Sequence, residues 1–349
     1  MNNETLMNIL NDFNSDTINY EIIIIANTYN IKKETKQWNY SHALFDEFFS
    51  REEFAEISSA IYNIFGFVKV FYSEVEFVKY VIENTIDIDN TIVFNFSRDG
   101  IHEGKKSLIP AFCDLFGIKY TGSNAFVISL LRNKYVFSNF LYQLGVPVPN
   151  TCIYDKELGF ISGLPTKGKK IIKCVNESAS IGLTNSNIIE IKDTTPYEKI
   201  VHIMNTMKTN KVLIQDYIEG DECEVLVLKY KQHYYALDPI MLKIPNSPII
   251  TSSISNSYDY EFCLLSDNYN KELCNKICKC AEKAAALLNI KTYARFDFRI
   301  DSDKNYFLFD IAGTPYTIKH SSINYIFKKY GLSYQDIYKT IVQVTKNID

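Results

Sequence analysis

Residues 294–300 read ARFDFRI and residues 306–311 read YFLFDI, with the polar turn 301–305 between them. Apolar and polar side chains alternate in 294–300, and 306–311 is rich in aromatic residues, which predicts two strands joined as a hairpin. Successive side chains of a strand point to opposite faces, so Arg295 and Asp297 share one face. If Asp310 lies across from this pair, two carboxylates and a guanidinium meet on one surface.

Such a surface has two interpretations. Carboxylates beside a cation suit Mg²⁺, which takes oxygen ligands and commonly shares its shell with phosphates. Arg295 would then neutralise charge that develops on a phosphate. The alternative is a half-exposed hairpin with an ordinary Arg–Asp pair, and the pattern of this hairpin alone favours that alternative.

Two segments upstream offer groups for a phosphate and a nucleoside. Lys173 lies on a predicted strand, and the small polar loop 176–182 follows it. Small residues let backbone amides approach a phosphate, although an ordinary surface turn fits as well. Neither a Walker A spacing nor G-x-G-x-x-G is present. Residues 212–222, VLIQDYIEGDE, form a strand and a Gly turn that ends in an acid. They suit an adenine and a ribose, or simply an interdomain connection.

Alternating strands and helices predict an α/β fold along the whole chain. Strands at 21–26, 67–72 and 91–96, with a helix at 45–65, would make a first domain with ligand-binding loops at the carboxyl edge of its sheet. Beyond residue 216 the strands lengthen. Residues 222–230 and 233–242 are expected to pair antiparallel, before a long helix at 272–288.

Composition excludes several classes of protein. The 349 residues suffice for two or three subdomains, and 46% hydrophobic with 22% charged residues indicate a packed core. A net charge of −4 argues against a nucleic-acid partner. No apolar run is long enough to span a membrane, and residues 1–14 do not have the pattern of a secretory signal. We therefore expect a cytoplasmic protein with reduced cysteines.

Cys274, Cys278 and Cys280 are close together in the sequence. Two of them are one helical turn apart, but the third points elsewhere and no His lies nearby. Packing on a buried helix is therefore favoured over a zinc site.

Taken in order, these segments resemble the D-alanine–D-alanine ligase family of ATP-grasp enzymes, over about residues 91–345. Residues 117–123 (GIKYTGS), 132–134 (RNK) and 258–261 (YDYE) add to the resemblance. It implies an ATP-grasp fold of three α/β subdomains, with an N-terminal Rossmann-like domain at 1–122. A central subdomain would span 123–215, and a C-terminal subdomain with the metal site would span 216–349.

The same resemblance implies roles for individual side chains. Arg295 and Ser180 would be catalytic. Asp297 and Asp310 would bind Mg²⁺, with Mn²⁺ as an alternative ion. The substrates would contact Tyr316, His320 and Ser321. ATP would be bound by Lys134, Lys173, Ser178, Gln215, Asp216, Ile218 and Glu222.

The implied reaction joins two small molecules, a carboxylate and an amine, with amino acids as candidates for both. Mg-ATP phosphorylates the carboxylate, the amine attacks the acyl phosphate, and phosphate leaves. Charge on the phosphates would be handled electrostatically rather than by covalent catalysis. Family analogy also suggests a homodimer.

The sequence departs from the family pattern at four places. The third metal ligand, an Asn, is replaced by Ala312. A Gly beside the reacting acyl group is replaced by Tyr316. The phosphate Lys and the Tyr of the mobile loop fall on Cys263 and Leu264. The substrate-binding Glu of the N-terminal segment is not recognisable within 26–45.

These departures favour a ligase of altered specificity, with a pocket formed by 29–42, 97–104 and 316–321. The retained charged set supports turnover. Ala312 and Cys263 favour the alternative, a non-catalytic or regulatory ATP-binding protein on the same fold. A true D-alanine–D-alanine ligase is a minor alternative.

Overall fold

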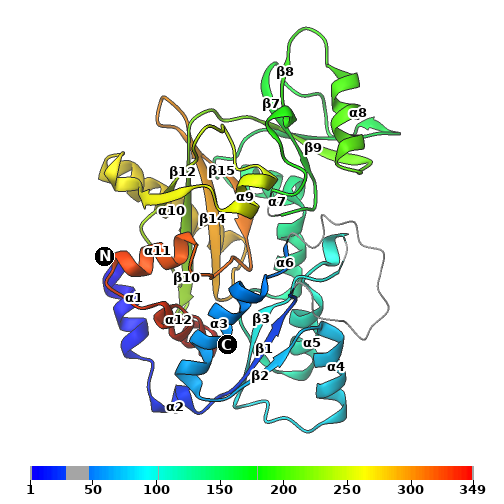
Figure 1. Ribbon diagram of the computed structural model, residues 1–349. Helices are drawn as coiled ribbons and strands as arrows, with labels where there is room; N and C mark the ends of the chain where they lie inside the picture. The colour runs from blue at the N-terminus through cyan, green and yellow to red at the C-terminus, as the bar shows by residue number, and fades with distance from the viewer. Residues whose placement is uncertain (1, 29–46, 101, 179, 348–349) are drawn as a thin grey trace.

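A computed structural model describes residues 2–28, 47–100, 102–178 and 180–347. Within them the chain forms three β-sheets, which follow one another along the sequence (Figure 1). Helices cover the sheets, as the predicted α/β fold requires. The exact limits of the three predicted subdomains remain a prediction.

The first sheet is parallel, with the order β2-β1-β3-β4. Ile22 and Ile24 face one core, which they share with α3, whereas Ile23 and Ile25 face another, shared with α4 and α5. The strands are therefore buried on both faces, as expected of a parallel sheet. These elements are β1 (Glu21–Ala26), α3 (Arg51–Phe65), β2 (Val68–Phe71), α4 (Glu74–Glu83), β3 (Thr91–Phe96), α5 (Leu108–Phe116) and β4 (Lys119–Tyr120).

Helix α3 begins later than the predicted start at residue 45, and residues 47–50 precede it. Ser50 and Glu53 form a capping box: the Glu53 amide donates to Ser50 Oγ at 3.1 Å, and the Ser50 amide donates to Glu53 Oε2 at 2.6 Å. The amides at the start of a helix have no carbonyl of a preceding turn to bond to. The capping box gives two such amides side-chain acceptors, so the helix starts at Arg51. The predicted helical start was wrong for these residues.

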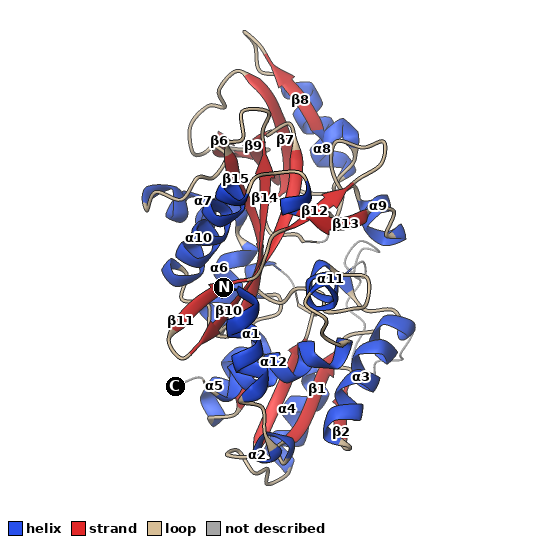
Figure 2. Cartoon of the chain, turned by 90° about the vertical axis from the view of Figure 1, so that its left-hand side faces the viewer, coloured by secondary structure: helices blue, strands red, loops and turns tan. Residues whose placement is uncertain are grey.

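The second sheet is antiparallel, with the order β6-β5-β9-β7-β8, and helix α8 covers one of its faces (Figure 2). It forms the lobe at the top of both views. Helices α6 and α7 lead into it from the first sheet. The elements are α6 (Ala125–Arg132), α7 (Lys134–Gln143), β5 (Thr151–Asp155), β6 (Gly159–Phe160), β7 (Gly168–Cys174), β8 (Ile188–Ile191), α8 (Tyr197–Thr206) and β9 (Lys211–Asp216).

The third sheet has the order β13-β12-β10-β14-β15, with β11 paired to β10. Helix α10 packs on one face, and α11 and α12 pack on the other. The core that contains α12 also includes Ile24 and Phe94 of the first sheet, so α12 joins the two sheets. The elements are β10 (Asp221–Tyr230), β11 (His233–Ala236), β12 (Ile240–Lys243), α9 (Ser252–Ser257), β13 (Glu261–Leu264), α10 (Lys271–Leu287), β14 (Tyr293–Ile300), β15 (Tyr306–Ala312), α11 (Ser322–Lys329) and α12 (Tyr334–Lys346).

The predicted strand 233–242 is two strands rather than one. Both pair antiparallel with β10, but the register slips by one residue between Ala236 and Ile240. Pro239 lies in this break and has no amide hydrogen to donate to a ladder, so a bulge forms there. The expected antiparallel pairing is confirmed, and the expectation of an unbroken strand was wrong.

The three clustered cysteines lie on α10 with their side chains in the core. Burial raises the pKa of the Cys278 and Cys280 thiols to about 12, which keeps both protonated. Packing, the favoured interpretation, is therefore what the structure shows. Within the ranges given above, no helix is both long and apolar enough to cross a bilayer.

Two short helices at the N-terminus, α1 (Asn2–Asn11) and α2 (Ser15–Ile18), had no counterpart in the sequence prediction. Strands β5, β6 and β8 and helices α8 and α9 were also not predicted. Most of these elements have six residues or fewer, too few for a hydrophobic period to show.

The turn between β9 and β10 depends on Gly220. Its φ is 143°, and a Cβ there would lie 1.9 Å from the carbonyl oxygen of Ile300. We expect Gly220→Ala to lower the free energy of unfolding by more than about 2 kcal/mol, through backbone strain and this close approach. Urea unfolding measures the loss. Gly159→Ala is the matched control, because φ there is 74° but no atom lies within 4 Å of the added Cβ. The control should cost about 1 kcal/mol, and equal losses would contradict the assignment.

Candidate functional site

The hairpin β14–β15 places its three predicted residues together. Asp297 and Asp310 are cross-strand partners. Arg295 donates two hydrogen bonds to Asp297, each of 2.8 Å, and its guanidinium lies 3.1 Å from Glu224 on β10. Asp297 is only 6% exposed. The side chains of Arg295 and Asp310 are partly exposed, at 22% and 30%. The hairpin therefore carries a partly buried group of charges rather than the isolated Arg–Asp pair that the pattern alone favoured.

Further cations surround these acids. Lys134, at the start of α7, lies 2.5 Å from Asp310. Arg299 stands four residues after Arg295 on the same face of β14, and it lies 3.4 Å from Glu222. Four acids and four cations therefore meet around the hairpin: Glu222, Glu224, Asp297, Asp310, Lys134, Lys173, Arg295 and Arg299.

Burial shifts the protonation of these groups. It lowers the pKa of Lys173 to about 8, reinforced by the charge of Lys134. It raises the pKa of Asp297 in spite of Arg295, and it raises the pKa of Glu224 to about 7. Burial alone would also raise the pKa of Asp310, but Lys134 and Lys173 outweigh it and lower that pKa. Burying each of these charges costs free energy, so a ligand of opposite charge would stabilise this site more than it would stabilise a surface site.

The carboxylates fit a divalent cation that brings other ligands with it. Among the described residues, no three His, Cys, Asp or Glu side chains gather closely enough to hold a metal by themselves. Asp297 and Asp310 supply two carboxylates on one face, and Ala312, the next residue on that face of β15, supplies none. Mg²⁺ commonly completes such a shell with water and phosphate oxygens.

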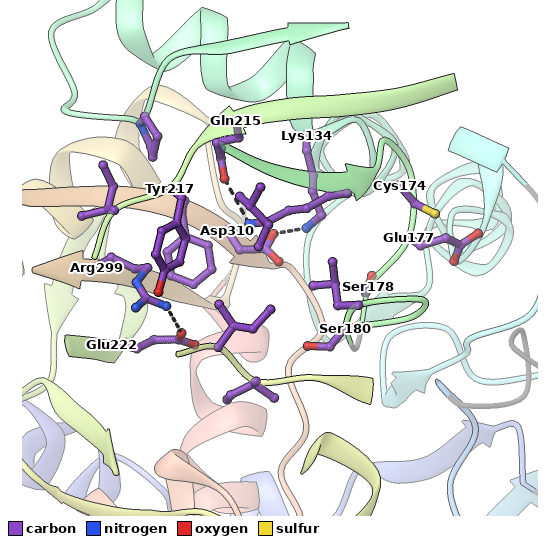
Figure 3. A pocket seen from close by; sticks show the side chains of 18 of the residues that line it. Lys134, Cys174, Glu177, Ser178, Ser180, Gln215, Tyr217, Glu222, Arg299 and Asp310 are labelled. Carbon is purple, nitrogen blue, oxygen red and sulfur yellow. Dashed lines mark hydrogen bonds and ion pairs between the residues drawn. The ribbon is translucent and has the colours of Figure 1, made fainter. Parts of the chain in front are cut away.

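A cleft beside the hairpin contains all of the predicted nucleotide residues (Figure 3). Lys173 Nζ donates to Gln215 Oε1 at 3.0 Å and lies 4.8 Å from the centre of the Phe309 ring. Gln215 is 1% exposed, and its Nε2 has no hydrogen-bond partner in the described structure. A buried donor without a partner costs free energy, and an acceptor nitrogen of a nucleobase would satisfy it. The carboxylate of Asp216, by contrast, already pairs with Lys170 and Asn150.

Two serines that line this cleft are held by residues of other elements. Ser178 Oγ accepts a hydrogen bond of 2.6 Å from Arg132, and the Ser180 carbonyl accepts one from Ser252 on α9. The clear space in the cleft is about 80 Å³. Ligand pockets commonly measure ~300–1,000 Å³, so the cleft must widen before a nucleotide can enter.

A second and larger cavity, of about 620 Å³, adjoins the cleft. It contains the predicted catalytic and substrate residues Arg295, Ser180, Tyr316, His320 and Ser321. Of the predicted substrate pocket, residues 29–42 lie outside the described residues. The cleft and the cavity share eight lining residues: Lys134, Glu177, Ser178, Ser180, Glu222, Ile250, Phe309 and Asp310.

The three predicted substrate residues differ in how many of their polar atoms already have hydrogen-bond partners. Ser321 Oγ donates to the Ile318 carbonyl at 2.6 Å and caps α11 by accepting from the Asn324 amide at 3.2 Å. The hydroxyl of Tyr316 donates to the Glu47 carbonyl at 2.7 Å.

His320 packs against the rings of Tyr258, Tyr260 and Phe262, and its Nε2 has no hydrogen-bond partner in the described structure. Burial lowers the pKa of His320, so it is neutral at pH 7.

Several residues of the site were missed by the sequence prediction. Glu224 and Arg299 could have been found, because they stand two and four residues from Glu222 and Arg295 and so share their faces. Arg98 lies within the predicted pocket segment 97–104 and does line the larger cavity. Glu47, Lys105 and Lys106 lie at or beside the same cavity, and the Lys–Lys pair was their only local sequence signal.

Comparisons with known proteins agree with this geometry. The sequence profile described as D-ala D-ala ligase C-terminus matches residues 164–343. The D-alanine–D-alanine ligase of Aquifex aeolicus is 22% identical over 248 residues, 68% of this chain and 78% of the relative. That of Pseudomonas fluorescens is 24% identical over 271 residues, 75% of this chain and 76% of the relative.

Solved structures show the same fold. The Bacillus anthracis D-alanine–D-alanine ligase complexed with ATP has a TM-score of 0.64 at 14% identity, covering 93% of this chain and 97% of that one. The Coxiella burnetii D-alanine–D-alanine ligase also has a TM-score of 0.64, at 12% identity, covering 94% of each chain. The predicted ATP-grasp fold is confirmed.

The variant Asp297→Asn tests whether Asp297 and Asp310 together bind a metal ion. Loss of one charged ligand should cost about 1.5–3 kcal/mol, roughly tenfold or more in the affinity for Mg-ATP. Calorimetry with and without Mg²⁺ measures this. Asp303→Asn, in the exposed turn of the same hairpin, is the matched control and should leave the affinity unchanged. Mg²⁺-dependent binding that survives in Asp297→Asn would exclude this metal site.

Proposed function

Because the chain belongs to the D-alanine–D-alanine ligase family of ATP-dependent carbon–nitrogen ligases, we propose that it joins a small carboxylate to a small amine through an acyl phosphate, with a specificity different from that of the named relatives. One observation carries the proposal. The cleft with the predicted nucleotide residues and the larger cavity share the eight residues named above, two of which, Phe309 and Asp310, lie on the hairpin. A triphosphate that ends there would meet a carboxylate held in the cavity.

The residues present support each part of this reaction. Lys134 and Lys173 would hold phosphate oxygens, while Gln215 would face the base. Asp297 and Asp310 would hold Mg²⁺, which would neutralise phosphate charge and orient the transferred group.

Arg295 is held rigid by Asp297 and Glu224, so it is preorganised to stabilise charge on the transferred phosphoryl group. A carboxylate oxygen of the acid attacks the γ-phosphorus and ADP departs. The amine nitrogen then attacks the acyl carbon, losing a proton, and phosphate leaves.

Altered specificity is supported by the substrate cavity. Tyr316 brings a large ring to its wall, packed against Phe49 at a centroid distance of 5.2 Å. Cys263, at the position of the phosphate Lys in the resemblance, packs in the core with α10 and accepts a hydrogen bond from Asn268. Phosphate charge would therefore be handled by the other cations of the site.

A non-catalytic ATP-binding protein is the second candidate, favoured by Ala312, which leaves two carboxylates for the metal. The intact set of charged groups supports turnover instead. A strict D-alanine–D-alanine ligase remains a minor candidate.

The deciding experiment measures phosphate release from Mg-ATP across a panel of amino acids and small carboxylic acids, each with an amine acceptor. We expect release that requires one class of acid and falls at least about a hundredfold in Asp310→Ala, which removes a metal carboxylate and unpairs Lys134. Asp303→Ala is the control. Tight ATP binding without release for any acid would favour the non-catalytic candidate.

A further inference from the structure

A buried group of charges lies at the cavity, away from the hairpin in sequence. Glu47 is 1% exposed and is contacted by three cations: Lys105 at 3.2 Å, Lys106 at 2.5 Å and Arg132 at 3.2 Å. One carboxylate needs one cation for charge balance, so Glu47 is strongly overcompensated. Both of its oxygens lie in ion pairs, Oε1 with Lys105 and Arg132 and Oε2 with Lys106.

One further acid joins this group. Glu177 lies 3.7 Å from Lys105 and 3.3 Å from Arg132. Arg98, 2% exposed, adds a fourth cation whose charge acts on Lys106. The Glu47 cluster, as we call these six residues, thus contains four cations and two carboxylates among the described residues: Glu47, Arg98, Lys105, Lys106, Arg132 and Glu177.

Among the described residues, the contacts that hold Arg98 are with a carbonyl and two aromatic rings, and none of them is with a carboxylate. It donates to the Thr314 carbonyl at 3.2 Å, and its guanidinium lies 4.2 Å from the Tyr316 ring centre and 4.8 Å from that of Phe49. Its Nε has no hydrogen-bond partner within the described residues. The two rings fix its direction, and its charge remains available.

An excess of buried positive charge is expensive unless an anion compensates it. Burial and the charges of Arg98, Arg132 and Lys105 lower the pKa of Lys106 to about 7, against the attraction of Glu47. Arg98, Lys106, Arg132, Glu47 and Glu177 all line the 620 Å³ cavity that also contains Arg295. An anionic group bound in this cavity would restore the balance.

We propose that the acid substrate carries a second anionic group, a carboxylate or a phosphate, which binds at Arg98, Lys106 and Arg132 while its reacting carboxylate faces Arg295. This inference rests on the proposed function for the identity of the reacting group. It excludes a zwitterion of the size of alanine as the preferred acid, since such a molecule brings no second anion.

Binding tests the inference separately from turnover. The probes are linear dicarboxylates from malonate to adipate, each paired with the monocarboxylate of equal chain length, and the matching phosphonocarboxylates. Calorimetry is performed with a non-hydrolysable ATP analogue already bound. We expect one dianion to bind at least about tenfold tighter than its monoanion. The second anionic group is a carboxylate if a dicarboxylate binds most tightly, and a phosphate if a phosphonocarboxylate does.

Lys106→Met should remove this preference. Lys167→Met, which removes an exposed lysine paired with Asp193 on the second sheet, is the matched control and should retain it. Melting curves show whether both variants are folded. If Lys106→Met does not fold, the comparison of dianion and monoanion binding by the wild-type protein still tests the inference. Lys106, facing Glu47, Arg98, Lys105 and Arg132, has a pKa of about 7 and loses its charge as the pH rises through that value, so dicarboxylate affinity should fall over the same range.

The outcomes separate the two proposals. Dianion preference that depends on Lys106 supports the inference even if no acid releases phosphate, in which case the ligase proposal fails alone. Release that is fastest with monocarboxylates or alanine overturns the inference and leaves the ligase standing. Equal binding of monoanions and dianions, or dianions that displace the nucleotide analogue, also overturns it.

Discussion

The contact on which the site depends is the partly buried ion pair between Arg295 and Asp297. It lies on β14, an interior strand of the third sheet, where β10 pairs on one side and β15 on the other. The antiparallel register sets Asp297 opposite Glu224 on one side and opposite Asp310 on the other. Strand pairing, which is maintained by many backbone hydrogen bonds, therefore gathers carboxylates that would otherwise repel one another.

Holding these charges costs free energy that the rest of the fold must supply. Burial penalises the charged forms of Asp297, Glu224 and Lys173. The apolar layers on both faces of the third sheet stabilise it against this cost. Helix α12 contributes to the same core as the first sheet. The domain that supplies Glu47 is thus held firmly against the hairpin, and the site is preorganised rather than assembled by the ligand.

The larger cavity has two ends of different chemistry. Around the hairpin, acids and cations are nearly balanced, as suits a metal and phosphates that arrive together. Around Glu47, cations exceed acids within the described residues. Glu177 and Ser178 join the two ends, because both contact Arg132 and both line the neighbouring cleft. A change at Arg132 would therefore reach the lining of the cleft.

The sequence by itself determined the elements whose chemistry is local. Alternation along β14 placed Arg295 and Asp297 on one face, because the period of a strand is two. Asp310 lies opposite Asp297 only because the register of the hairpin shifts by one residue between Asp297 and Phe298, and neither the alternation nor the turn indicates that shift. The order of Lys134, Lys173, Gln215 and Glu222 along the chain was enough to identify the ATP-grasp fold. The start of α3 and the break at Pro239 were missed, because a side-chain cap and a bulge change the backbone without changing the hydrophobic pattern.

Tertiary structure alone decided what the substrate cavity looks like. Glu47 and Arg132 are 85 residues apart, and Arg132 and Ser178 are 46 apart, so no periodicity relates them. Their meeting depends on how the first sheet packs against the third, which follows from many weak apolar contacts. Charges brought together in this way have no signature along the chain. For this reason the fold and the metal carboxylates could be predicted, whereas the excess of buried cations could not.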